Sequence, residues 1–214
     1  MTEAPAGDRV PQPPLGSASP GVPGPRALLV VISGPSGVGK DSVLDELERR
    51  GHHFHRVITC TTRPPRKSER AGIDYHFVSE AEFDALIARD GLLEHAEVYG
   101  KRYGVPRAQV EDQLAAGNDV VVRTDVQGAA SIRRLMPDAV LIFLAPPSLE
   151  ELETRLRERG ADDGDRIDRR LAAARGEMAR SGEFGYVVVN EPGRLDEAAD
   201  RLEEILDAAR LRAN

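Results

Sequence analysis

The sequence predicts a three-layer α/β fold in which a parallel sheet lies between layers of helices. The first basis is residues 27–33 (ALLVVIS), a continuous apolar run with β-branched residues, which is typical of a strand buried on both faces. The second basis is that similar runs recur along the chain with helical patterns between them. These further predicted strands are residues 119–122, 139–144 and 186–189.

The predicted helices follow from apolar periodicity and from residues that begin or end helices. Residues 148–159 carry leucines on one face, and Ser148 is a natural N-cap. Residues 107–116 are followed by Gly117, which is typical of a helix end. The other predicted helices are residues 42–50, 128–135 and 195–211.

Two segments interrupt this alternation. Residues 1–26 hold seven of the fifteen prolines, and such a segment cannot bury enough apolar surface to offset its ordering entropy. We therefore predict a disordered tail there. Residues 63–104 contain a Pro-Pro pair, dense charge and short β-like pieces such as Tyr75–Val78. This stretch predicts a subdomain inserted into the α/β core.

The bulk composition limits the partners of the chain. Its 214 residues suit one domain with a substantial core, and its net charge of −7 repels nucleic-acid backbones and acidic membranes. A single cysteine, Cys60, excludes an internal disulfide and suits a reducing compartment. No apolar run approaches the roughly 20 residues that span a bilayer. We expect a cytoplasmic protein that binds small molecules, as a monomer or small homo-oligomer.

The strongest motif is a phosphate-binding loop between the first strand and a helix. Glycines let the backbone turn its N–H groups toward a phosphate, the helix N-terminus adds partial positive charge, and Lys40 adds a full one. The loop predicts the binding of a nucleoside triphosphate. Its residues are Gly34, Pro35, Ser36, Gly37, Val38, Gly39, Lys40, Asp41 and Ser42.

One position in this loop is unusual. A Ser or Thr that contacts Mg²⁺ usually follows the lysine, whereas here Asp41 follows it and the hydroxyl comes one place later, at Ser42. The shift points away from GTPases and motor ATPases and toward nucleoside monophosphate kinases. We expect Mg²⁺ to accompany ATP, with Ser42 as its candidate ligand. Whether Asp41 also helps to hold the metal stays open.

A second group of residues fits a phosphate acceptor. Arg63 and Arg66 flank two stiff prolines, so their guanidiniums can clamp a phosphate. Surface arginines in contact with water are the competing interpretation. Downstream lie Tyr75, Glu94 and Tyr103, of which the carboxylate can accept from the N1–H and N2–H₂ groups of guanine.

A third group of arginines predicts a closing lid. Arg155 and Arg159 share a helix face, and Arg170 follows a small polar loop on the next predicted helix. Phosphoryl transfer needs such charges, since the moving group carries dispersed negative charge. For the neighbouring arginines, including Arg166 and Arg169, a solvated face is the better interpretation.

These motifs together resemble guanylate kinase. The resemblance rests on GPSGVGKDS, TTRPPR, GIDYHFVS, LLEHAEVYGKRYG, TDVQGA, APPSLEEL, RLRERG and VVVNEP, in that order, and covers about residues 28–211. It implies a P-loop kinase with a central parallel sheet flanked by helices. Its implied parts are a core (27–58, 106–154 and 171–214), a GMP-binding subdomain (59–105) and a helical lid (155–170).

The resemblance also implies a role for individual positions and the reaction ATP + GMP = ADP + GDP, with dGMP as a further expected acceptor. The implied catalytic residues are Lys40, Arg155, Arg159 and Arg170. Asn190 is implied beside adenine. The residues implied for the GMP phosphate are Arg63, Arg66, Tyr75 and Tyr103, and those for guanine are Thr59, Glu94 and Asp125. Asp125 is equally suited to cap the helix that follows it.

Two positions depart from the family pattern. Val105 stands where a Ser or Thr usually contacts guanine, and Arg123 stands where a second Asp is frequent. We expect Val105 to remove one hydrogen bond to the base, which is worth about 0.5–1.5 kcal/mol.

Two other kinds of protein share parts of this pattern. Ribose 1,5-bisphosphate phosphokinases share a similar phosphate loop, but the arginine pair and Glu94 argue against a sugar phosphate acceptor. Scaffold proteins carry related domains that bind phosphopeptides without catalysis. Those tend to have damaged phosphate loops, whereas Gly39 and Lys40 are intact here.

Overall fold

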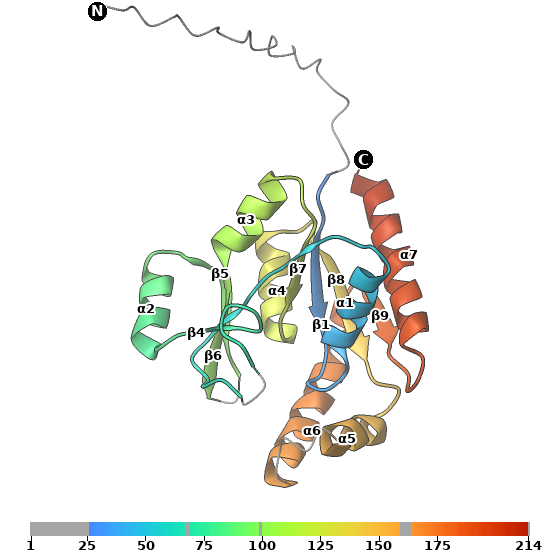
Figure 1. Cartoon of the computed structure of the whole chain (residues 1–214). Coiled ribbons are helices and arrows are strands. Elements are labelled where there is room, and N and C mark those ends of the chain that lie inside the picture. Colours follow the sequence, from blue (N-terminus) through green and yellow to red (C-terminus); the bar gives the residue numbers. More distant parts are fainter. Residues whose placement is uncertain (1–25, 67–68, 99, 159–163, 214) are drawn as a thin grey trace, which may run out of the picture.

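The computed structural model describes residues 26–66, 69–98, 100–158 and 164–213 (Figure 1). Five parallel strands form its central sheet in the order β2-β7-β1-β8-β9. The strands are β1 (Leu29–Ser33), β2 (His55–Arg56), β7 (Val120–Arg123), β8 (Val140–Ala145) and β9 (Tyr186–Val189). The predicted α/β fold with a parallel central sheet is confirmed. The predicted tail, residues 1–26, lies outside the described residues except for Arg26.

Helices cover both faces of this sheet because the side chains of β1 alternate between two cores. Val30 and Ile32 pack with one helix pair, and Leu29 and Val31 pack with the other. The first pair is α1 (Lys40–Arg49) and α7 (Leu195–Ala213), and the second is α3 (Arg107–Ala115) and α4 (Val126–Leu135). The sheet is therefore buried on both sides, as its continuous apolar runs predict.

A smaller second sheet lies beside the core, in the order β4-β3-β6-β5. Its strands are β3 (Cys60–Thr61), β4 (His76–Phe77), β5 (Leu92–Val98) and β6 (Lys101–Pro106). Helix α2 (Glu80–Ala88) packs on it through the fully buried Phe83, and begins at a capping box between Ser79 and Glu82. The insertion was predicted from the sequence, whereas α2 and the β5–β6 hairpin were not.

A pair of helices lies beside the loop that follows β1 (Figure 1). α5 (Leu149–Glu158) and α6 (Gly164–Ala179) pack through Leu152, Leu156 and Ile167, and a 3-10 turn (Ser181–Glu183) follows them. The hydroxyl of Ser148 accepts from the N–H of Glu151, so the predicted N-cap is confirmed.

Helix boundaries differ slightly from those predicted, for reasons visible at the caps. α1 begins at Lys40 rather than at residue 42, because Gly39 is already its N-cap, with φ 97°. α4 begins at Val126 rather than at residue 128, because Asp125 caps it. Gly117, with φ 81°, follows α3 as predicted.

Candidate active site

A cavity of about 1060 Å³ lies where the phosphate loop, the second sheet and the α5–α6 pair meet. It brings together all but three of the predicted site residues. Pro35 and Val38 do not line it, and Arg159 lies outside the described residues. The predicted residues that line it are Gly34, Ser36, Gly37, Gly39, Lys40, Asp41, Ser42, Thr59, Arg63, Arg66, Tyr75, Glu94, Tyr103, Asp125, Arg155, Arg170 and Asn190.

The backbone of the loop requires glycine at several positions. Gly34 has φ 135°, and a Cβ there would lie 2.1 Å from the carbonyl oxygen of Leu144. Gly39 has φ 97°, and a Cβ there would lie 2.5 Å from Nδ2 of Asn190. Both conformations are rare for residues with side chains, and both positions lack the space for one.

Two polar side chains, from the residue after β9 and from α5, hold this loop in place. The side chain of Val38 is fully buried in the core, but its carbonyl oxygen accepts from Nδ2 of Asn190 at 2.8 Å and from Nη1 of Arg155 at 3.3 Å. Arg155 also donates to the carbonyl oxygen of Asn190 at 2.9 Å. These two side chains therefore hold the backbone of the loop in this structure.

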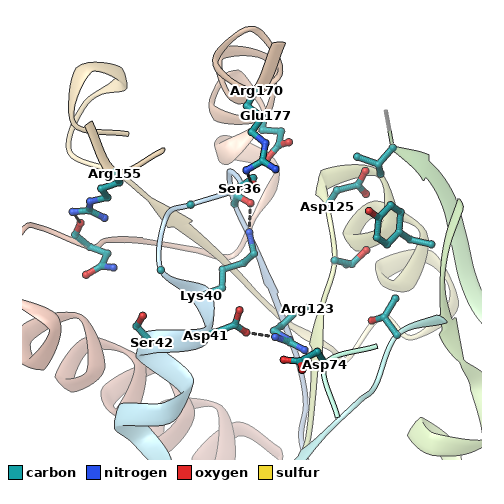
Figure 2. Close-up of a pocket in the computed structure, with 18 of the residues that line it drawn as sticks. Ser36, Lys40, Asp41, Ser42, Asp74, Arg123, Asp125, Arg155, Arg170 and Glu177 are labelled. Carbon is teal, nitrogen blue, oxygen red and sulfur yellow. Dashed lines mark hydrogen bonds and ion pairs between the residues drawn. The ribbon is translucent and has the colours of Figure 1, made fainter. Parts of the chain in front are cut away.

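Lys40 lies over the loop with its ammonium group buried (Figure 2). Its Nζ donates to the carbonyl oxygens of Gly34 and Pro35, the latter at 3.0 Å. Burial lowers the pKa of Lys40, and the nearby Glu177 on α6 opposes that change. A phosphate entering the loop would offer this ammonium a far stronger acceptor than the two carbonyls.

The acceptor side of the cavity is built around Arg63. Its guanidinium forms two hydrogen bonds of 2.9 Å with Glu69 and a 3.3 Å bond to the hydroxyl of Tyr103. It also lies 5.3 Å from the centre of the Tyr75 ring, within the range of a cation–π contact. The two arginines of the predicted clamp are therefore not merely solvated, because Arg66 also lies 3.7 Å from Glu69.

Glu69 is a site residue that the sequence analysis missed. Burial would raise its pKa, but the bonds from Arg63 and from the Arg66 backbone hold it below the usual range. The carboxylate thus acts as an internal anion for the arginine pair. Glu69 lies three residues after Arg66, but in a loop this spacing does not predict that the two side chains are in contact.

The predicted base-binding residue Glu94 is buried, with 6% of its surface exposed. Oε1 accepts from the hydroxyl of Thr124 at 3.0 Å, while Oε2 has no partner among the residues that the structure describes. Burial raises the pKa of Glu94 to about 7. A Cβ on Gly128 would lie 2.8 Å from both oxygens, so glycine makes room for this carboxylate.

Asp125 caps α4, as the sequence allowed. Its Oδ1 accepts from the N–H groups of Gln127 at 3.1 Å and Gly128 at 2.8 Å. The residue also lines the cavity beside Glu94. A capping role and a position at the cavity are therefore compatible in one side chain.

Val105 was expected to face guanine. Its side chain is instead fully buried and packs with Leu93 and Val110 in the core that covers one face of the central sheet. It does not line the cavity. The pairing of β5 with β6 shifts between Leu92 and Glu94, and such irregularities in register are not readable from alternation alone.

Further polar residues line the cavity without having been predicted as site residues. Asp74 precedes Tyr75, Glu177 reaches the cavity from α6, and Arg123 ends β7. Burial raises the pKa of Glu177, and Lys40 opposes that change. In the sequence, Asp74 belongs to the motif GIDYHFVS, and Arg123 is a departure from the family pattern.

Comparison with known proteins decides the family. The sequence model described as guanylate kinase matches residues 26–209. The chain belongs to the guanylate kinase family. A guanylate kinase from Thermobifida fusca is 48% identical over 84% of this chain and 91% of its own length. Guanylate kinase 2, chloroplastic/mitochondrial, from rice is 43% identical over 92% of this chain and 70% of its own.

A solved structure supports the same assignment. The guanylate kinase of Anaplasma phagocytophilum superposes with a TM-score of 0.70 at 34% sequence identity, covering 87% of this chain and 88% of the other. The activity of this family is the ATP-dependent phosphorylation of GMP to GDP. Among the helices that the structure describes, none combines the length and the apolar character needed to cross a membrane.

Proposed function

We propose that the chain converts ATP and GMP to ADP and GDP with the phosphate loop as donor site and the second sheet as acceptor site. One observation carries this division: a single cavity contains the loop around Lys40 and, facing it, the arginine–tyrosine cluster and the buried Glu94. In this proposal residues 59–105 form the GMP-binding subdomain, residues 155–170 form the lid and the rest of 27–214 forms the core.

The chemical step is an in-line displacement. An ionised oxygen of the GMP phosphate forms a bond to the terminal phosphorus of ATP. The bond from that phosphorus to the bridging oxygen breaks, and its electron pair leaves with ADP. No proton has to move, so the side chains act by positioning the substrates and stabilising charge.

On the donor side, the backbone N–H groups of residues 36–42 donate to the ATP phosphates, and Lys40 turns from the loop carbonyls to the terminal phosphate. Asn190 borders the adenine. Arg170 lies 3.4 Å from the hydroxyl of Ser36, so it can reach a phosphate held in the loop. Arg155 and Arg159 complete the lid, with Arg155 supporting the loop through its contacts with Val38 and Asn190.

On the acceptor side, contacts between side chains of the protein are replaced by contacts with GMP. Its phosphate replaces the carboxylate of Glu69 at the arginine pair, with the hydroxyls of Tyr75 and Tyr103 beside it. The unpartnered oxygen of Glu94 fits the N1–H and N2–H₂ groups of guanine, which a sugar phosphate lacks. The proposed phosphate ligands are Arg63, Arg66, Tyr75 and Tyr103, and the proposed guanine ligands are Thr59, Glu94 and Asp125.

Mg²⁺ fits the donor site. Ser42 presents an exposed hydroxyl at the cavity on the first turn of α1, whereas the carboxylate of Asp41 is bound by Arg123. Mg²⁺ in kinase sites is held by few protein oxygens together with phosphates and water, so one hydroxyl suffices. We therefore assign Ser42 as the metal ligand. When bound, Mg²⁺ would neutralise charge on the ATP phosphates.

The wider setting belongs to the same proposal. We infer a cytoplasmic protein with ATP and GMP as partners, dGMP as an accepted analogue and no nucleic acid or membrane. The compartment rests on the single cysteine, and the rice relative carries an organellar name. The assembly is proposed as a monomer or small homo-oligomer, which sedimentation would determine.

A coupled assay of ADP release tests the function. We expect release that depends on GMP, continues with dGMP at a lower rate and is at least about tenfold slower with AMP or UMP, because neither base matches Glu94. Ribose 1,5-bisphosphate, added in place of GMP, should give no release. Release with the sugar phosphate but not with GMP would contradict the proposal.

A further inference from the structure

An ion pair inside the cavity has no place in the roles assigned above. Arg123 ends β7 at the carboxyl edge of the sheet, and Asp41 lies in the first turn of α1. Nη1 of Arg123 donates to Oδ1 of Asp41, and both residues line the cavity (Figure 2). Arg123 is the more buried partner, with 21% of its side chain exposed against 59% for Asp41. The cation is therefore held at the cavity wall, and the carboxylate is the more hydrated partner.

Arg123 lies where the two halves of the cavity meet. It pairs with Ile32 near the end of β1, just before the phosphate loop begins. The next residue, Thr124, donates its hydroxyl to Glu94 on the acceptor side. Burial raises the pKa of Tyr75 on that side, and the charge of Arg123 opposes this rise. Arg123 therefore borders both the donor and the acceptor.

The chemistry of the guanidinium suits that position. A guanidinium carries five N–H donors in a planar fork, and its fork geometry matches two phosphate oxygens. The bond to Asp41 engages Nη1 and fixes the plane of the group, which reduces the entropy lost when a phosphate binds. The remaining donors can serve a phosphate in the cavity.

We propose that Arg123 is a catalytic residue that binds the phosphoryl group passing from ATP to GMP, and that Asp41 is its positioning residue. This rests on the proposed function, because it needs that transfer to occur. As the bond from the GMP oxygen to phosphorus forms and the bond to the bridging oxygen breaks, negative charge spreads over three equatorial oxygens. Arg123 stabilises this charge from the edge of the sheet.

The competing explanation is that the ion pair only ties α1 to β7. Three variants separate the two: Arg123→Gln, which removes the charge, Arg123→Lys, which keeps it without the fork, and Asp41→Asn, which breaks the pair but keeps the arginine. Arg50→Gln is the matched control. Arg50 is 20% exposed and ties α1 to α7 through Asp200 at 2.6 Å, and neither residue lines the cavity.

The variants are assayed for kcat and for KM of GMP and ATP, with thermal unfolding measured alongside. We expect Arg123→Gln to lower kcat by about 100-fold, Asp41→Asn by about tenfold and Arg123→Lys by an intermediate factor. Arg50→Gln should lower the unfolding temperature and leave kcat within about twofold. Arg123→Lys retains the charge and provides a folded comparison if Arg123→Gln is unstable.

Two results would overturn the inference. If Arg123→Gln and Asp41→Asn lower kcat equally, the pair is a tether. If Arg123→Gln lowers the unfolding temperature as Arg50→Gln does but keeps full kcat, Arg123 does not contact the phosphoryl group that is transferred. A wild-type protein without GMP-dependent ADP release would instead contradict the proposed function itself, so the two failures are distinguishable.

Discussion

The donor and acceptor halves of the cavity are built in different ways. The phosphate loop presents its backbone to the ligand. Its glycines allow its shape, and the side chains of Asn190 and Arg155 donate hydrogen bonds to the carbonyl oxygen of Val38. The acceptor half is built from side chains. Glu69 pairs with the arginines, and Glu94 is buried with one oxygen that has no partner among the described residues. The backbone of the loop therefore has its shape before ATP binds, and only Lys40 has to exchange its contacts, whereas the acceptor half must exchange the contacts of Glu69 and its arginines for those of GMP.

This difference suggests how selectivity arises. A backbone loop recognises any polyphosphate, since its donors face phosphate oxygens alone. A buried carboxylate recognises a particular pattern of donors, because an analogue that lacks them leaves it unpaired. We therefore expect the acceptor half to determine selectivity for guanine and the donor half to determine the rate of phosphate transfer.

The largest effect expected from this division is that of Lys40→Ala. Removing a charge that stabilises the moving phosphoryl group should lower kcat by about 10²–10³-fold. The folding stability should not fall, because burial of the ammonium is unfavourable to its charged form. A coupled assay with thermal unfolding measures both quantities. Full turnover in this variant would show that the loop is not the donor site.

The next effect concerns Glu94 and has a defined pH dependence. Guanine donates hydrogen bonds, so it needs the ionised carboxylate, and the pKa of Glu94 is raised to about 7 by burial. The affinity for GMP should therefore rise as the pH increases from 6 to 8. Glu94→Gln should weaken GMP binding by about 10–100-fold and remove the part of this rise that the carboxylate causes.

The control for that experiment lies in GMP itself. Its phosphate also titrates, near pH 6. This titration affects the wild type and Glu94→Gln alike, so the difference between their pH profiles isolates the carboxylate. Parallel profiles would mean that Glu94 does not bind the base.

A smaller effect tests the backbone nature of the donor half. Gly39→Ala should destabilise the fold by about 2 kcal/mol or more, because a left-handed conformation is strained and Nδ2 of Asn190 occupies the space. Gly51→Ala is a matched control, since Gly51 has φ 93° with nothing within 4 Å of an added Cβ. Chemical denaturation measures both. Equal losses would show that the contact with Asn190 contributes nothing.

The smallest effect on GMP binding is expected for Val105→Ser. Because Val105 is fully buried away from the cavity, the affinity for GMP should change by less than about threefold. The free energy of unfolding should fall by about 1–3 kcal/mol, since a hydroxyl enters an apolar core. Calorimetry and denaturation separate the two. Clearly tighter GMP binding would show that the side chain reaches the base after all.

Features that depend on neighbours in the chain are predicted from the sequence better than contacts formed on folding. Periodicity and residue type suffice for strand β1, the turn of the loop and the cap at Asp125. Glu69, Gly128 and the Arg123–Asp41 pair depend on segments brought together by folding. Val105 shows the limit most clearly, because it packs with Leu93 and Val110, which alternation along a single strand does not reveal.

Calorimetric titration of GMP into Lys40→Ala and Arg63→Gln tests the division of labour most directly. We predict that Lys40→Ala binds GMP within about threefold of the wild type, while Arg63→Gln binds it at least about tenfold more weakly, because only Arg63 belongs to the acceptor half. A large loss of GMP affinity in Lys40→Ala, with little loss in Arg63→Gln, would contradict the account.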